Sequence, residues 1–298
     1  MKKSIILLIA AAFGAGTIFT GCSDDDFGKS EIYAPFLPEN AFDRWLKTNY
    51  LEPYNIVFQY RFKDVLGDMD YNLAPVQYDQ GIMMAKLTLH LTLQAYDEVT
   101  GSQQFIRQNF PKIVHLIGSA AYNSNNSVVL GVAEGGKMMT LYEGNEVAER
   151  MENRDMVTLN ERYFKTMHHE FGHILHQTKP YPVAFNNVNG DKYVGDACFE
   201  TYPTDQSARL DGFITPYSAT SADEDFVENI SLYVTSTAEE WASYIAQGGD
   251  NTPILERKIE IVRAYMQDTW GIDIDKLRKI VLRRQSEIWD LDFSIEEE

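Results

Sequence analysis

Residues 165–180, KTMHHEFGHILHQTKP, constrain the fold of this chain more than any other stretch. Residues 169–173 match the pattern H-E-x-x-H. In an α-helix, two residues four positions apart lie on one face, about 6 Å apart along the axis. The imidazoles of His169 and His173 can therefore reach one Zn²⁺, and Glu170 is offset so that it can act as a general base instead of a ligand. The pattern predicts a helix that carries half of a catalytic zinc site.

Two further histidines in this stretch are not expected to bind the metal. His168 points about 100° away from His169 around the helix axis. His176 shares a face with His173, but it lies nearly two turns from His169, which makes tetrahedral coordination from one straight helix hard. We expect His176 beside the site, where it can contact a ligand histidine.

A third ligand has to come from elsewhere, and residues 216–233, PYSATSADEDFVENISLY, offer one. Glu224 and Glu228 are four residues apart on a predicted helix that begins near Ser221. Ser221 and Glu224 also match a capping box, in which Glu224 only satisfies the helix terminus. Glu228 can equally be a solvated helix residue, and Tyr217 can equally be ordinary loop packing. These alternatives remain open from the residues alone.

H-E-x-x-H followed by E-x-x-x-[DE] on a later helix resembles the gluzincins, the thermolysin-like clan of zinc peptidases. This resemblance implies that Glu224 is the third zinc ligand and that Glu228 orients a ligand histidine. HEFGH with the later EDFVE is still more similar to the catalytic domain of anthrax lethal factor. That likeness implies a zincin-like fold and a catalytic role for Tyr217, seven residues before Glu224.

The N-terminus resembles that of an exported lipoprotein. Two lysines precede an apolar run over residues 5–19, which is too short to span a bilayer and is typical of a signal peptide covering residues 1–21. The following FTGCSDDD resembles a lipobox, so Cys22 is expected to be lipidated, with ordinary secretion as the alternative. Residues 23–26 resemble the acidic export tag of Bacteroidetes outer-membrane lipoproteins; otherwise they form a solvated tether. We expect an outer-membrane lipoprotein facing the cell exterior, with residues 22–38 as its tether.

Several longer segments resemble one group, the substrate import-associated zinc metallohydrolase lipoproteins of Bacteroidetes. They are the lipobox with its acidic tail, HHEFGHILHQTKPYP, GFITPYSATSADEDFVE and WGIDIDKLRKIVLRR. The resemblance covers essentially the whole mature chain. It implies a location beside a TonB-dependent nutrient importer, but it does not supply a substrate.

The hydrophobic pattern of the rest of the sequence, together with these resemblances, predicts an α+β, zincin-like fold. It forms a single catalytic domain, residues 39–298. A small mixed sheet and the active-site helix are expected in residues 39–178, and a mainly helical part with the third ligand in residues 179–298. Strands are predicted at 55–63, 112–118, 127–134 and 137–143, with residues 137–142 at the edge of the substrate cleft. Helices are predicted at 78–99, from a cap at Thr158 or Asn160 to Gln177, and at 223–235, 254–270 and 274–289; residues 179–221 are expected to be loop.

The amino-acid composition limits the kinds of partner that we expect this chain to bind. The 298 residues are 44% hydrophobic, enough for one large domain, and the formal net charge of −18 repels phosphate backbones, so nucleic-acid binding is not expected. With Cys22 lipidated, Cys198 is the remaining cysteine, and we expect it to be a buried thiol.

Together these residues predict a hydrolase with one zinc ion, held by His169, His173 and Glu224. Glu170 would take a proton from zinc-bound water as it attacks a peptide bond, and Tyr217 would stabilise the oxyanion. A peptide or protein is the expected substrate. Two alternatives stay open: a non-catalytic, zinc-containing lipoprotein that binds cargo for the importer, and a zinc hydrolase of non-peptide amides. A structural zinc site needs no general base, so Glu170 argues against the first.

Overall fold

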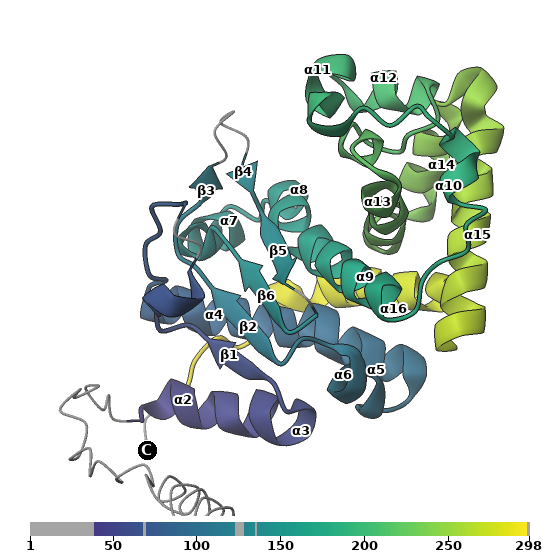
Figure 1. Ribbon diagram of the computed structural model, residues 1–298. Helices are drawn as coiled ribbons and strands as arrows, with labels where there is room; N and C mark the ends of the chain where they lie inside the picture. Colours follow the sequence, from purple (N-terminus) through teal and green to yellow (C-terminus); the bar gives the residue numbers. More distant parts are fainter. Residues whose placement is uncertain (1–38, 68–69, 123–127, 135, 297–298) are drawn as a thin grey trace, which may run out of the picture. The chain divides into compact units, whose positions relative to one another are not determined.

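The computed structural model describes residues 39–67, 70–122, 128–134 and 136–296 (Figure 1). Within it, Asn40–Glu298 form one compact unit. The predicted signal peptide, Cys22 and the tether to residue 38 lie outside the described residues. No helix in the described ranges combines the length and the apolar character that crossing a bilayer requires.

A four-stranded mixed sheet forms the β part of the fold. Its strands, in spatial order, are β1 (Val57–Gln59), β2 (Ile113–Leu116), β6 (Met138–Leu141) and β5 (Gly131–Glu134). The first three run parallel, and β5 runs antiparallel to β6. A separate two-stranded ribbon pairs β3 (Ala121–Tyr122) with β4 (Val128–Val129). The mixed sheet was predicted, and the α+β fold class is confirmed.

The strand boundaries differ from the prediction in three ways. The strand predicted over residues 127–134 is divided, in its described part, into β4 and β5, which belong to different sheets. The strand expected over residues 55–63 forms only Val57–Gln59, although the flanking Ile56 and Tyr60 are buried as their alternation suggested. Residues 137–142 do not form the edge of the sheet, because β6 pairs with β2 on one side and β5 on the other. The edge on this side is β5, the short strand that ends the described sheet.

Helices precede and connect the strands, and two of them contain a π-helical turn. The elements are α2 (Ala41–Leu46) with the π turn η1 (Lys47–Leu51) and α3 (Glu52–Tyr54); the 3₁₀ turn η2 (Asp64–Leu66); α4 (Tyr78–Thr88) with the π turn η3 (Leu89–Leu93) and α5 (Gln94–Thr100); α6 (Gln104–Asn109); the 3₁₀ turn η4 (Gly144–Glu146); and α7 (Val147–Glu152). The helix predicted at 78–99 is confirmed as the α4–η3–α5 run. The helices over α2–α3, α6 and α7 were not predicted.

The helix predicted around the histidine motif is present as α8 (Met156–Leu159), the π turn η5 (Asn160–Phe164) and α9 (Lys165–Thr178). The predicted cap at Thr158 or Asn160 is wrong. Asp155 caps the helix instead, its carboxylate accepting the backbone N–H of Thr158 at 3.0 Å. Thr158 and Asn160 already lie inside the helix, because the π turn continues it without a break.

The C-terminal half is mainly helical, as predicted, but it holds more helices than the pattern indicated. Residues 179–221 are not all loop: they contain α10 (Asn186–Asn189), η6 (Gly195–Ala197), α11 (Cys198–Thr201), α12 (Asp205–Leu210) and η7 (Tyr217–Ala219). Then follow α13 (Ala222–Thr235), α14 (Ala238–Ala246), η8 (Gly249–Asn251), α15 (Thr252–Trp270), α16 (Ile274–Glu287) and η9 (Ile288–Asp290). Helix α14, capped by Thr237, was not predicted. Cys198 is buried, as expected.

Helix α9 packs between the sheet edge and helix α13 (Figure 1). On the α13 side, Gly172 faces Val227, and a Cβ at Gly172 would lie 3.0 Å from Val227 Cγ1 and 3.2 Å from its Cβ. On the sheet side, Gly131 of β5 faces Thr166 and Glu170, with an added Cβ 2.8 Å from Thr166 Cγ2. Because Gly172 and Gly131 have no side chains, helix α13 and strand β5 can pack close to the H-E-x-x-H motif on α9.

A buried ion pair fixes the first turn of α13 to helix α15. Lys258 of α15 and Asp225 of α13 are both fully buried, and their charged groups are in contact. The Lys258 ammonium also donates to the Gly212 carbonyl at 2.6 Å and lies 4.6 Å from the centroid of the Phe213 ring. Tyr193 donates to the Asp225 carboxylate at 3.0 Å. Lys258 thus ties α13 to α15 and to the segment that precedes η7.

Replacing Lys258 by methionine should destabilise the protein strongly, because the Asp225 carboxylate would stay buried without its partner. We expect the free energy of unfolding to fall by about 3–5 kcal/mol. Arg257→Met on the same helix is the matched control, since the Arg257–Glu260 pair is exposed and such pairs contribute less than about 1 kcal/mol. Urea denaturation followed by circular dichroism measures both. Equal losses in the two variants would contradict the assignment.

Candidate metal centre

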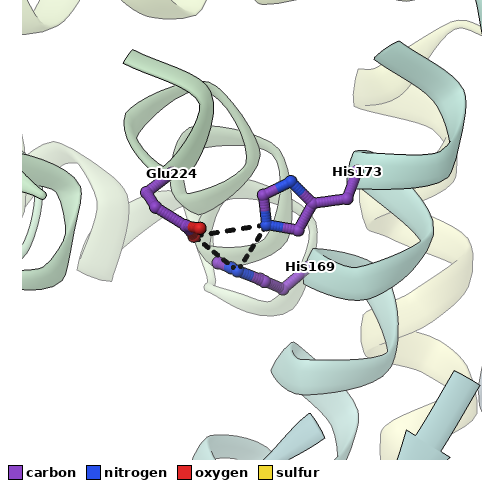
Figure 2. A group of neighbouring side chains, drawn as sticks. All are labelled: His169, His173 and Glu224. Carbon is purple, nitrogen blue, oxygen red and sulfur yellow. Dashed lines mark hydrogen bonds and ion pairs between the residues drawn. The ribbon is translucent and has the colours of Figure 1, made fainter. Parts of the chain in front are cut away.

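Three side chains from two helices converge on one point (Figure 2). His169 and His173 extend from consecutive turns of α9, and Glu224 extends from the first turn of α13. The Nε2 atoms of the two histidines are 3.2 Å apart. Oε2 of Glu224 lies 3.1 Å from His169 Nε2 and 3.2 Å from His173 Nε2. The three atoms form a nearly equilateral triangle.

This triangle has the dimensions of three corners of a zinc site. With bonds of about 2.0–2.1 Å in a tetrahedron, neighbouring ligand atoms lie roughly 3.3 Å apart. Two imidazole nitrogens with one carboxylate oxygen are a donor set of catalytic zinc sites, which keep the fourth position open. Within the described ranges, no other group of three or more His, Cys, Asp and Glu side chains brings ligand atoms this close. The residues present fit one Zn²⁺.

The capping alternative for Glu224 is resolved by the direction of its side chain. The Ser221 hydroxyl accepts the backbone N–H of Glu224 at 3.2 Å, so Ser221 does cap α13. The carboxylate of Glu224 does not return to this cap but points to His169 and His173. The cap fixes the backbone of Glu224, and its side chain is left for the centre.

Glu228 is not a solvated helix residue, because its side chain is only 3% exposed. Its Oε1 accepts from His169 Nδ1 at 2.9 Å, which leaves Nε2 as the ring nitrogen that faces the triangle. Its Oε2 accepts from Lys165 Nζ at 2.8 Å and from Thr215 Oγ1 at 2.7 Å. Neither Lys165 nor Thr215 was predicted. Lys165 could have been found, because it lies one turn before His169 on the same face, whereas Thr215 carries no sequence signal.

The other motif histidines lie outside the triangle. His176 Nε2 is 3.1 Å from His173 Nδ1, so His176 contacts a triangle histidine from the side away from Glu224. His168 is buried on another face of α9, with Nδ1 3.4 Å from the Tyr96 hydroxyl, and burial lowers the pKa of its imidazole to about 3. It is a neutral core residue.

Glu170 is buried between α9 and β5. Burial raises the pKa of its carboxyl, and the negative charge of Glu224 adds to this. His169 and a hydrogen bond from the backbone of Ala133 act in the opposite direction. A carboxylate whose pKa is raised toward neutrality is suited to accept and return a proton.

Tyr217 lies at the exposed side of the centre, with its ring centroid 5.8 Å from that of His169. The Phe199 ring stacks on the Tyr217 ring, with the two centroids 6.3 Å apart. The residue is 38% exposed, so a substrate can reach it. Partial burial, followed by the negative charge of Glu224 and Glu170, raises the pKa of its phenol. The hydroxyl therefore keeps its proton at neutral pH and can donate it in a hydrogen bond.

Without a metal ion, the triangle holds a proton. Burial alone would lower the pKa of His169, but its hydrogen bonds to Glu224 and Glu228 raise it to about 10. Burial alone would raise the pKa of Glu224, but its hydrogen bonds to His169 and His173 lower it to about 2. These shifts favour an imidazolium paired with a carboxylate at neutral pH, so a cation that bound here would displace a proton.

A family model and a solved structure both relate this chain to the same family of proteins. The model of the family described as "Putative zinc-binding metallo-peptidase" matches residues 37–275. This match covers most of the chain, so the chain belongs to this family of zinc-binding metallopeptidases.

One solved structure is similar to this chain over nearly the whole length of the solved chain. It is described as a "putative zinc-binding metallo-peptidase" from Bacteroides caccae ATCC 43185. The two chains share 38% identity with a TM-score of 0.72, and the match covers 85% of this chain and 94% of that one. The comparison with curated proteins gives no match.

Zinc binding should release a proton from His169 and tighten as the pH rises. The His169 pKa of about 10 means that this ring is protonated in the metal-free chain from pH 6 to 9. Binding then releases at least one proton, and the zinc Kd should fall by about tenfold for each pH unit. Calorimetric titration in buffers of different ionisation enthalpy counts the protons. Glu228→Gln, which removes the negative charge beside His169, should release fewer protons at pH 8; a Kd that does not change with pH would contradict the assignment.

Proposed function

We propose that this chain is a peptidase that depends on one zinc ion, held by His169, His173 and Glu224. The observation that carries the proposal is the triangle of ligand atoms, with edges of 3.1–3.2 Å, next to a buried glutamate on the same helix. Zinc in such a site supplies a Lewis acid that acidifies water and polarises a carbonyl group.

Glu170 and Tyr217 supply the remaining chemistry. Glu170 accepts a proton from the attacking water as the water oxygen bonds to the carbonyl carbon, and it returns the proton to the leaving nitrogen as the C–N bond breaks. Tyr217 donates a hydrogen bond to the carbonyl oxygen as that oxygen becomes negative. Donors of this kind lower the barrier by about 2.7–4 kcal/mol.

The free edge of β5 favours a peptide over other amides as the substrate. In the described sheet, β5 pairs with β6 alone, so its outer side offers backbone groups to an extended chain. Gly131 and Ala133 of β5 lie next to Glu170. A peptide that adds to this edge as a further strand would pass directly beside the general base.

The buried Glu170 also favours an enzyme over a lipoprotein that only binds cargo. Burial of a carboxylate with a raised pKa costs free energy. A site that only holds a structural ion has no use for such a group. Glu170 therefore supports catalysis as the function of the centre.

Glu170→Gln should abolish peptide hydrolysis and leave zinc bound, because the amide cannot accept the proton and is not one of the ligands. Tyr217→Phe should lower kcat by about 10²–10³-fold with little change in zinc content. Cleavage of a broad peptide mixture, followed by mass spectrometry, and zinc content by atomic emission measure these effects. Phe199→Leu is the matched control for a change beside Tyr217 that removes no polar group. Activity retained in Glu170→Gln would exclude Glu170 as the base.

We further propose that the peptidase is anchored by a lipid on Cys22 to the outer membrane, facing the cell exterior. The support is the sequence: an apolar signal segment, a lipobox-like FTGC and the acidic residues 23–26. The resemblance to the import-associated lipoproteins supports a position beside a TonB-dependent importer. There the enzyme would cleave peptides or proteins before uptake.

Cys22→Ala should release the protein from the membrane fraction. Wild-type chain should partition with membranes, incorporate radiolabelled palmitate and be cleaved when intact cells are treated with protease. The variant should lose the label and appear in soluble fractions, and Cys198→Ala should behave as wild type. Labelling that persists in Cys22→Ala would place the anchor elsewhere.

A further inference from the structure

Glu228 contacts three side chains of the centre through its two carboxylate oxygens. Oε1 lies 2.9 Å from Nδ1 of His169. Oε2 lies 2.8 Å from the Lys165 ammonium and 2.7 Å from the Thr215 hydroxyl. The Glu228 side chain is only 3% exposed, so these protein groups are its main partners. The two donors to Oε2 therefore decide where Oε1 lies, and with it the direction of the His169 ring.

Among the described residues, Lys165 and His169 are the two basic side chains in ionic contact with Glu228. It precedes His169 by one helical turn, so the helix itself fixes the distance between the two residues. Asp223, Glu224, Asp225 and Glu228 bring four carboxylates into the first two turns of α13. Lys258 forms an ion pair with Asp225, and Lys165 forms one with Glu228, so each lysine balances the charge of one carboxylate.

Thr215 links the same carboxylate to the segment that carries Tyr217. Its hydroxyl donates to Glu228 and accepts the backbone N–H of Ser218 at 3.2 Å. Ser218 follows Tyr217 directly in the turn η7. One buried hydroxyl thus connects the partner of a ligand histidine to the turn that presents the phenol.

We propose that Lys165 and Thr215 are positioning residues: through Glu228 they hold the His169 ring toward the metal, and Thr215 also holds the Tyr217 turn. The first part concerns metal binding alone. The second part rests on the proposed function, because it assigns Tyr217 a role in hydrolysis.

Zinc affinity tests the role of Lys165 without any substrate. The full chain in detergent is titrated with zinc against a chromophoric chelator, and the Co²⁺-loaded form reports the ligand field by its visible absorption. Lys165→Met should weaken zinc binding by about 10–100-fold and alter the Co²⁺ spectrum. Lys165→Arg, which keeps the charge, should restore most of the affinity, and Lys279→Met at an exposed site on α16 should match wild type.

Wild-type zinc affinity and Co²⁺ spectrum in Lys165→Met would overturn the assignment. So would an equal loss in Lys165→Arg, because the charge would then not be the cause. These measurements need no peptide hydrolysis. A chain that binds zinc in this way but cleaves no peptide would refute the proposed function and leave the role of Lys165 intact.

Kinetics test the role of Thr215. Thr215→Val keeps the shape and removes the hydroxyl, and it should lower kcat at least about tenfold with KM unchanged. Thr215→Ser should restore kcat. With zinc at saturating concentration, so that the effect through His169 is suppressed, Thr215→Val should add little to Tyr217→Phe, since both then act on the same hydrogen bond to the substrate oxygen. If Thr215→Val does not fold, Thr215→Ala gives the same comparison; independent, multiplying losses in the double variant would refute the link.

Discussion

The close crossing of α9 and α13 is the contact on which the metal centre depends. Gly172 has no side chain where Val227 packs, and an added Cβ would lie 3.0 Å from it. Glu224 and Glu228 lie on either side of Val227 in the α13 sequence, and both reach the imidazole of His169 on the facing helix. A side chain at position 172 would require Val227 to move by a few tenths of an ångström, and a large one would separate the helices. The spacing between two helix backbones therefore sets the geometry of the triangle.

The pKa values of two glutamates in this centre, Glu224 and Glu170, are shifted in opposite directions because their surroundings differ. Glu224 accepts hydrogen bonds from two histidines, which lower the pKa of its carboxyl to about 2 and keep it ionised. Glu170 lies in the same centre, but burial dominates and raises its pKa. A ligand has to stay charged, whereas a general base has to exchange a proton near neutral pH. The division of roles thus follows from the hydrogen bonds each carboxylate receives.

Much of the architecture was readable because it depends on local periodicity. The sheet, the long helix over 78–99 and the helix around the histidines all carry sustained apolar patterns. The helices between residues 179 and 221 were missed because four to six residues are too short to show a period. The cap of the motif helix was misplaced because the π turn Asn160–Phe164 continues the helix past both predicted caps.

What the sequence determined by itself is the part of the site that lies within one helix. The spacing of His169, Glu170 and His173 follows from 3.6 residues per turn, whatever the rest of the chain does. Only the tertiary structure decided that Glu224 completes the triangle instead of capping its own helix, and that Thr215 reaches Glu228. These contacts join residues far apart in the chain, and they depend on how closely α13 packs on α9. No local pattern encodes that distance.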